Sequence, residues 1–230
     1  GVDFVAVKIG HAPKADAGKD ITVCAEEDID FDGSRSYIQK AGTAVAQWFL
    51  GDGTSQNGLK VKHRYHQPGT YQATLTLENK LNTMCPVSRD TRTITVNSAP
   101  IVAIKNLPSE CINKEVFFDA SSAADADGDE LDYYWNFGDG STFHSGPKIA
   151  HQYAQGGKYR VSVVVDDRKG TSCSSSTAEA NIFINTPPSA DAGLNQSCCV
   201  NRKTHFSASA SSDPDDDQLV YIWDLGDGTV

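Results

Sequence analysis

Two short acidic loops carry the residue types best suited to metal chemistry in this chain of 230 residues. Each loop has three aspartates at alternate positions: Asp125, Asp127 and Asp129 in the first loop, and Asp213, Asp215 and Asp217 in the second. Alternating carboxylates on a turn can converge on a hard cation such as Ca²⁺, which takes about six to eight oxygen ligands. Without a cation, like charges held so close together cost Coulomb energy. The sequence therefore predicts a Ca²⁺ site in each loop and leaves a solvated polar turn as the alternative.

Three other aspartates resemble catalytic acids, and each lies in the tripeptide Gly-Asp-Gly: Asp52, Asp139 and Asp227. Because the same aspartate stands in every copy, we interpret it as a turn residue that accepts backbone N–H bonds. His63 and His151 recur in the same way. The sequence has no Gly-x-Ser-x-Gly, His-Glu-x-x-His or phosphate-binding loop. We therefore expect no catalytic residues, no organic cofactor and no enzyme activity.

Five of the six cysteines recur with a period close to 88 residues. They form two sets of equivalent positions: Cys24, Cys111 and Cys199 in one set, and Cys85 and Cys173 in the other. The economical pairing is one disulfide inside each repeat, Cys24 with Cys85 and Cys111 with Cys173, and the alternative is free buried thiols. Cysteines paired in register favour an oxidising, extracellular setting.

Cys198 has no counterpart in the other repeats. We expect it either to cross-link to another chain or to pair with a cysteine beyond residue 230, where we also place the partner of Cys199. A metal–thiolate site is the weaker interpretation, because no Cys-x-x-Cys or histidine cluster accompanies it.

The element that must position these residues is a six-residue stretch that occurs three times, at residues 48–53, 135–140 and 223–228. Each copy reads Trp, a variable residue, an apolar residue and Gly-Asp-Gly. The Trp and the apolar residue are two apart, so that both side chains point to one face of an extended strand. Gly-Asp-Gly supplies the positive φ angles of a tight hairpin. The stretch therefore predicts, in three copies, a strand with a buried Trp that leads into a hairpin.

Alternating apolar residues indicate a further strand after each of the first two hairpins, over residues 71–77 and 159–165. A two-residue period predicts one face in the core and one in water. No stretch has a convincing helical pattern, and so the sequence predicts an all-β fold.

The six-residue stretch resembles the signature of the PKD (polycystic kidney disease) domain, Trp-Asp-Phe-Gly-Asp-Gly. The second copy differs from it by Asn136 and the third by Leu225, whereas the first departs at Phe49 and Leu50. The resemblance implies tandem immunoglobulin-like, PKD-type β-sandwich domains of about seven strands. The acidic loops are similar to the Asp-Pro-Asp-Gly-Asp loop through which some PKD domains bind Ca²⁺. The first repeat has residues 37–43 in that place and is expected to lack a site.

The period of 87 to 88 residues predicts four segments. They are the last strand of a preceding repeat at 1–13, PKD-like domains at 14–98 (repeat 1) and 99–186 (repeat 2), and the first half of a further domain at 187–230 (repeat 3). Proline-containing junctions between them are short and stiff. We expect successive domains to stack end to end.

Composition limits the partners of the chain. A net charge of −10 argues against nucleic acid, and no apolar run is long enough to cross a membrane. Tandem domains, stiff junctions and disulfides favour a non-enzymatic structural or adhesive array, extracellular or at the cell surface. Such a stalk or filament would contact other copies of itself, other surface proteins or polysaccharide.

The alternative function follows from the PKD resemblance: a spacer or substrate-binding accessory region of a secreted hydrolase, either a protease or a chitinase. Sugar rings stack on flat aromatic faces, so exposed aromatic residues would favour it. The aromatic residues that fall outside the expected core are Tyr133, Phe143 and Tyr221.

Overall fold

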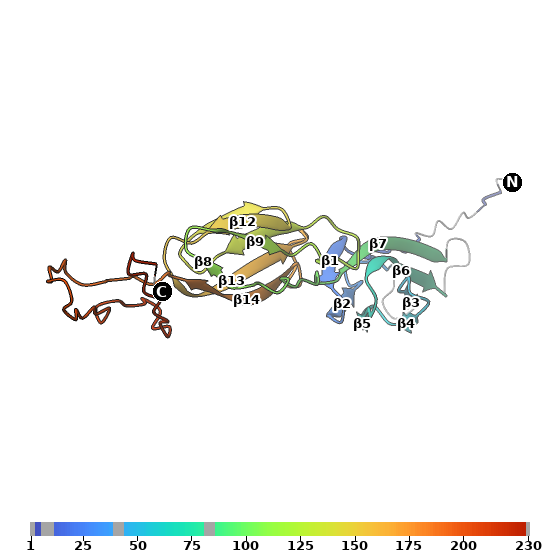
Figure 1. Cartoon of the computed structure of the whole chain (residues 1–230). Coiled ribbons are helices and arrows are strands. Elements are labelled where there is room, and N and C mark those ends of the chain that lie inside the picture. Colours follow the sequence, from blue (N-terminus) through green and yellow to red (C-terminus); the bar gives the residue numbers. More distant parts are fainter. Residues whose placement is uncertain (1–2, 6–11, 39–43, 81–85, 229–230) are drawn as a thin grey trace. The chain divides into compact units, whose positions relative to one another are not determined.

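The computed structural model describes residues 3–5, 12–38, 44–80 and 86–228 (Figure 1). These residues form fourteen β-strands, and none of them forms a helix that could cross a membrane. The predicted all-β class of tandem β-sandwiches is thereby confirmed. The predicted final strand of a preceding repeat falls largely on residues 6–11, outside the described residues.

The chain divides into two compact units. Unit 1 contains Gly1–Ile101 together with two loops of repeat 2, Ala124–Leu131 and Asp166–Ser176. Unit 2 contains Val102–Ala123, Asp132–Val165 and Thr177–Val230. The acidic loop of repeat 2 thus belongs to the unit that holds repeat 1.

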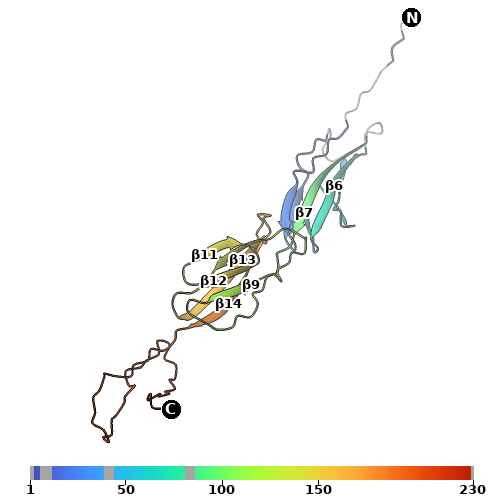
Figure 2. The same cartoon turned by 45° about the horizontal axis from the view of Figure 1, so that its top comes forward.

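Repeat 1 forms a five-stranded sheet and a two-stranded sheet. The first has the order β1-β7-β6-β3-β4, with β1 (Ile21–Cys24), β7 (Val87–Asn97), β6 (Gly69–Asn79), β3 (Ala44–Phe49) and β4 (Ser55–Asn57). The second pairs β2 (Asp28–Asp32) with β5 (Lys60–Arg64). β6 and β7 are antiparallel neighbours over their whole length (Figure 2). β1 pairs with β7 in parallel, and this register sets Cys24 opposite Asn97.

The Trp-containing stretch builds the core of repeat 1 as predicted. Trp48 and Leu50 are fully buried, whereas Phe49 between them is 47% exposed. Phe31 from the smaller sheet meets Trp48 edge to face, with ring centroids 5.2 Å apart. Alternate residues of β6 are buried against this pair, including Leu75 and Leu77. The two sheets therefore enclose one apolar core.

The hairpins after Trp48 and Trp135 require glycine. Gly51 and Gly138 have φ angles of +85° and +79°. A Cβ atom on Gly51 would lie 2.8 Å from the backbone nitrogen of Gln72, and one on Gly138 would lie 2.6 Å from the carbonyl oxygen of Arg160. Any side chain there would strain the backbone and collide with the neighbouring strand.

Repeat 2 has the same architecture. Its five-stranded sheet has the order β11-β10-β13-β14-β8, with β11 (Thr142–Ser145), β10 (Asp132–Asn136), β13 (Gly157–Asp166), β14 (Ser175–Asn185) and β8 (Glu110–Cys111). Its smaller sheet pairs β12 (Lys148–Gln152) with β9 (Glu115–Asp119). Trp135 and Phe137 are buried, as predicted.

The third Trp-containing stretch gives only half of the predicted result. Gly226 and Gly228 have positive φ angles, so the turn forms. However, residues 187–228 form no β-strand, Leu225 is 50% exposed, and Ile222 is 81% exposed. In repeat 1 the Trp strand β3 is hydrogen-bonded along its length to β6. No such neighbour is present among the described residues of repeat 3, and so the predicted third buried strand is wrong for this structure.

Candidate functional site

The acidic loop of repeat 2 gathers its carboxylates at one place. Asp125, Asp127 and Asp129 each present a carboxylate oxygen, and these oxygens all lie within 4.8 Å of one another. The backbone N–H groups of Asp127 and Asp129 donate to Asp125 Oδ1 over 2.8 and 3.5 Å. Gly128 between them has a φ of +77°, which lets the chain turn. The loop is thus folded around the side chain of its first aspartate.

Two carboxylate oxygens of this loop bear on whether it could hold a cation. Asp125 Oδ2 and Asp129 Oδ2 are buried, and neither has a hydrogen-bond partner among the described residues. A buried carboxylate oxygen without a partner is costly, because it has lost water and gained nothing. A hard divalent cation binds such oxygens, and the donor set therefore fits Ca²⁺.

A positively charged side chain of the protein, that of Lys169, lies beside the loop. Lys169 Nζ is 2.7 Å from Asp129 Oδ1. This hydrogen bond and the negative charges of Asp129, Asp167 and Asp127 raise the pKa of Lys169. The ammonium group offsets part of the loop's charge but leaves the two buried oxygens unpaired.

The same loop is attached to the end of repeat 1. Asp127 Oδ2 accepts a hydrogen bond of 2.7 Å from the backbone N–H of Ser98. Asn97 Nδ2 donates over 2.7 Å to Asp167 Oδ2, and both side chains are almost completely buried. Repeat 1 therefore ends in a polar junction made by two loops of repeat 2.

A disulfide completes this junction and overturns the predicted pairing. Cys24 bonds to Cys173, with Cα atoms 5.9 Å apart, and not to Cys85. The pairing register of β1 with β7 explains why the predicted disulfide is wrong. It sets Cys24 opposite Asn97, the last residue of β7. At about 3.3 Å per residue, the 11 residues of β7 place Val87, its first residue, about 33 Å from that end. Cys85 itself lies outside the described residues.

The predicted bridge between Cys111 and Cys173 is wrong for the same reason. β8 runs parallel to β14 and sets Cys111 opposite Asn185, the last residue of β14. Cys173 precedes Ser175, the first residue of that 11-residue strand. Cys111 and Cys173 therefore lie near opposite ends of β14. Cys111 is a free, exposed thiol.

The second predicted metal set is not brought together. Asp215 and Asp217 donate their backbone N–H groups to Asp213 Oδ1 over 2.8 and 3.4 Å, which reproduces the turn of the first loop. Asp215 Oδ2 accepts a hydrogen bond from the backbone N–H of Thr186. Among the described residues, however, only the first loop has three carboxylates within reach of one ion.

Histidine–aspartate pairs stabilise both complete hairpins, and their histidines were not predicted as partners. His63 Nε2 lies 2.6 Å from Asp52 Oδ2, and His151 Nε2 lies 2.7 Å from Asp139 Oδ2. The recurrence of each histidine 11 to 12 residues after its aspartate was the available signal. Asp52 also accepts the backbone N–H of Thr54, as expected of a turn residue.

Ser141 adds a hydroxyl to the second pair, but the three groups do not form a catalytic triad. Ser141 Oγ lies 3.4 Å from His151 Nε2, the same nitrogen that faces Asp139. A triad needs the carboxylate and the hydroxyl on different nitrogens of the ring, so that the histidine can take up a proton while it is held in place. The cluster is therefore a turn-stabilising network.

Asp139 is expected to make repeat 2 sensitive to acid. Burial of this carboxyl raises its pKa, but hydrogen bonds from Ser141 and His151 outweigh burial and lower the pKa to about 2. Because the folded state favours the carboxylate, a stabilisation of about 2 kcal/mol is complete above the unfolded pKa of about 3.9 and is lost as the pH falls toward 2. Urea unfolding between pH 2 and 6, followed by tryptophan fluorescence, measures this loss. In the Asp139→Asn variant, the free energy of unfolding of repeat 2 should depend less on pH between 2 and 4. An unchanged pH dependence would contradict the lowered pKa of Asp139.

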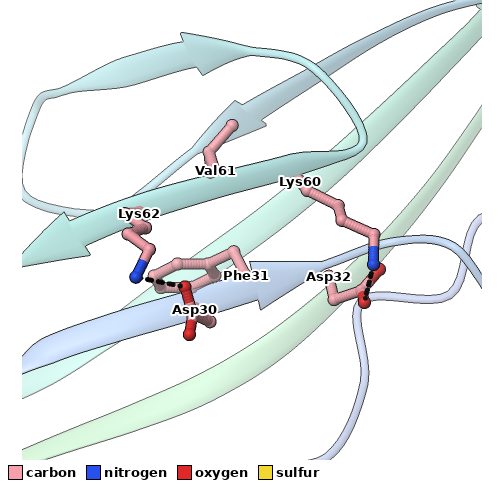
Figure 3. Close-up of a pocket in the computed structure, with 6 residues that line it drawn as sticks. All are labelled: Asp30, Phe31, Asp32, Lys60, Val61 and Lys62. Atoms are coloured by element: carbon pink, nitrogen blue, oxygen red, sulfur yellow. Dashed lines mark ion pairs between the residues drawn. The ribbon is translucent and has the colours of Figure 1, made fainter.

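A surface depression over β2 and β5 does not offer a second site (Figure 3). It lies over the buried ring of Phe31 and is lined by cross-strand neighbours. Lys60 pairs with Asp32 over 2.8 Å and Lys62 with Asp30 over 3.3 Å, as the dashed lines show. The charges cancel in pairs, and we assign no ligand to the depression.

Three aromatic residues were expected outside the core, and for Tyr133 this prediction is wrong. Tyr133 is buried on the same face of β10 as Trp135. Its neighbour Tyr134 is the exposed residue and stacks on His144, with ring centroids 4.5 Å apart. The two-residue period of a strand, counted back from Trp135, was the signal that could have placed Tyr133 in the core. Phe143 and Tyr221 are about half exposed, as predicted.

Relatives of known sequence include two collagenases. Collagenase ColA of Clostridium perfringens (strain 13 / Type A) is 32% identical over 108 residues, which cover 47% of this chain and 9% of that protein. A microbial collagenase of Vibrio alginolyticus is 29% identical over 123 residues, which cover 54% of this chain and 14% of that protein. The chain thus matches a small part of the length of these relatives.

Among solved structures, the PKD1 domain of Vibrio anguillarum Epp is similar, with 27% identity and a TM-score of 0.33, over 40% of this chain and 99% of that domain. The family profile of the PKD domain matches residues 10–96, 97–182 and 185–230. Because this profile matches nearly the whole chain in three consecutive segments, the chain belongs to the PKD domain family, as a tandem of PKD domains.

Proposed function

We propose that this chain is a non-catalytic spacer in an extracellular or cell-surface protein, where it holds other parts of that protein apart. The junction of unit 1 carries the proposal. Repeat 1 is joined to loops of repeat 2 by the Cys24–Cys173 bond in addition to the backbone at Asn97 and Ser98. Two covalent connections restrict rotation between consecutive repeats far more than a single peptide linker does.

The polar contacts of the junction add to this restriction. The Asn97–Asp167 hydrogen bond is buried, and breaking it would leave two buried groups without partners. The net charge of −10 keeps such chains apart from one another in solution. A stalk needs both properties, resistance to bending at junctions and a surface that does not aggregate.

A second candidate function is a binding accessory region of a secreted hydrolase. It is favoured by the collagenase relatives and by the exposed Tyr134–His144 stack on the outer face of β10 and β11. A flat aromatic face suits a sugar ring or an extended peptide. Repeat 1 has Gln47 and Asn57 at the equivalent cross-strand pair and lacks this face.

Co-sedimentation with fibrillar collagen, chitin and cellulose separates the two functions. For a spacer, we expect the chain to stay in the supernatant with all three polymers, and the Tyr134→Gln variant, which copies repeat 1, to behave identically. Binding by the wild type that weakens at least tenfold in Tyr134→Gln would overturn the spacer and establish the accessory function. Hydrolysis of any of the polymers would overturn both.

A further inference from the structure

We infer that a pocket in repeat 1 binds a small organic ligand through a carboxylate group, with the guanidinium group of Arg92 as its anchor. The pocket has a volume of about 470 Å³. It lies within unit 1 and is lined by the start of β1 and the residues before it, by β2 and the turn after it, and by β7. The inference concerns repeat 1 alone and does not depend on whether the chain is a spacer.

Arg92 belongs to a polar stripe on the inner face of β7. Ser88, Asp90 and Arg92 alternate along the strand, so that their side chains point to the same side. The segment before β1 covers the first two members of the stripe. Ser88 Oγ accepts the N–H of Ala15 over 3.0 Å, and Asp90 Oδ2 accepts the N–H of Ala17 over 2.6 Å. Arg92 is only 8% exposed, and its Nε has no hydrogen-bond partner among the described residues.

Burial makes the positive charge of Arg92 costly. The guanidinium group lies over the buried ring of Phe31, with its Cζ 5.0 Å from the ring centroid. Burial lowers the pKa of Arg92, and the influence of Tyr65 and Asp20 offsets this effect only in part. A buried charge destabilises the folded state unless a counter-charge accompanies it. An anion in the pocket would supply that counter-charge.

The other charges of the pocket also favour an anion. Lys19 and Arg35 are exposed and add two positive charges to that of Arg92. Asp30 and Asp32 line the pocket too, but each is paired with a lysine of β5, over 3.3 and 2.8 Å (Figure 3). The positive charges of the pocket therefore exceed the negative ones, although the chain as a whole is acidic.

The shape of the pocket favours a carboxylate over an inorganic oxyanion. A guanidinium group is planar and pairs with a planar carboxylate through two parallel N–H···O bonds. Gly18 has no side chain to fill the space beside Arg92, since a Cβ atom on it would lie 3.6 Å from Nη1. Ile21 gives the pocket an apolar wall. Such a wall suits the hydrocarbon part of an organic acid, whereas sulfate and phosphate have no apolar part to place against it.

Repeat 2 shows that the fold does not require this buried charge. The long strands β7 and β14 end at equivalent asparagines, and so Ala180 is the residue of repeat 2 that corresponds to Arg92. By the same count, Ala178 corresponds to Asp90. A PKD domain thus forms with alanine at both positions. The charged residues of the stripe are a property of repeat 1, and we attribute them to ligand binding.

Titration with sodium butyrate, followed by ¹H–¹⁵N NMR at constant ionic strength, tests the inference. The amide signals of Gly18 and Lys19 should shift in a saturable way, with a Kd of about 1 mM, because a ligand of few atoms binds weakly. The signals of Lys105 and Asn106, the equivalent residues of repeat 2, should stay in place. Butyramide has nearly the same shape without the charge and should cause no saturable shift.

The variant Arg92→Met keeps an unbranched side chain over Phe31 but removes the charge and the donors. We expect it to weaken butyrate binding at least about tenfold, the effect of losing one charged hydrogen bond. Lys148→Gln, in repeat 2, changes the net charge by the same amount and should bind butyrate as the wild type does. Lys19→Gln/Arg35→Gln changes only exposed side chains, so its folding is not in question, and it should weaken binding about threefold.

Several results would overturn the inference. Shifts of equal size in the wild type and in folded Arg92→Met would exclude Arg92 as the anchor. An unchanged Kd in Lys19→Gln/Arg35→Gln would contradict the site even if Arg92→Met did not fold. Equal shifts with butyramide, or no shift with butyrate far above the expected Kd, would exclude an anion site. Tighter binding of sulfate or phosphate than of butyrate would overturn the assignment to a carboxylate.

Discussion

Replacing Cys24 and Cys173 together by serine is expected to lower the free energy of unfolding by up to about 5 kcal/mol. The bond closes a loop across a sequence separation of 149 residues, and in the chain-entropy model such a loop removes about that much freedom from the unfolded chain. For a chain of this size the loss corresponds to a fall in Tm of about 10–20 °C. Differential scanning calorimetry measures it directly.

The matched control is Cys111→Ser, because this thiol is exposed and unbonded in the structure. We expect it to change the free energy of unfolding by less than about 0.5 kcal/mol. Reductant should lower the Tm of the wild type to that of the double variant and should leave the double variant unchanged. Equal Tm values for the wild type with and without reductant would show that the bridge is absent or carries no stability.

Calcium is expected to stabilise the chain through the acidic loop of repeat 2. We propose that Asp125, Asp127 and Asp129 bind one Ca²⁺, with a Kd of about 10⁻⁴ to 10⁻³ M, the range of extracellular modules. At 10 mM Ca²⁺ this affinity corresponds to a stabilisation of about 1.4–2.7 kcal/mol. Isothermal titration calorimetry gives the affinity, and the rise in Tm with added Ca²⁺ gives the stabilisation.

The variant Asp125→Asn/Asp129→Asn removes the charge from both buried, unpartnered oxygens while it keeps the shape of the side chains. We expect it to lose the response to Ca²⁺ and, without Ca²⁺, to be at least as stable as the wild type, because like charges no longer repel. Lys169→Gln should tighten Ca²⁺ binding, since the ammonium group competes at Asp129.

The control for the calcium experiment is Asp30→Asn, which removes an exposed carboxylate paired only with Lys62 across the strands. It should respond to Ca²⁺ as the wild type does. A rise in Tm of the same size in the Asp125→Asn/Asp129→Asn variant would locate the ion elsewhere and contradict the proposed site.

The local patterns of this sequence predict its core well. Trp48 and Leu50 share a buried face because a strand has a two-residue period, and Gly51 is needed because the hairpin leaves no room for a Cβ atom. The convergence of Asp125, Asp127 and Asp129 was predicted from their spacing, but the local turn does not suffice for it, because Asp213, Asp215 and Asp217 form the same turn without converging. What could not be read from the sequence is long-range register. The parallel pairing of β1 with β7 decides at which end of the sandwich Cys24 lies, and no pattern within either strand encodes that choice.

The hydrogen bond between the acidic loop and Ser98 could not be predicted from the sequence, for a related reason. The sequence shows that the loop is charged, but not that a loop of repeat 2 packs on the end of repeat 1. Likewise, the aspartate and the histidine recur in repeats 1 and 2, which indicated structural roles for Asp139 and His151. Only the fold showed that they contact each other.

The Cys24–Cys173 bond also bears on how the chain withstands proteolysis. If a protease cuts the backbone at one place between these two cysteines, for example in an exposed hairpin, the two fragments stay covalently attached to each other. The strands beside the cut remain held at their neighbours, so that a single cleavage nicks the chain without releasing either piece. A chain nicked in this way should run at its full mass on a non-reducing gel and separate into fragments only after reduction.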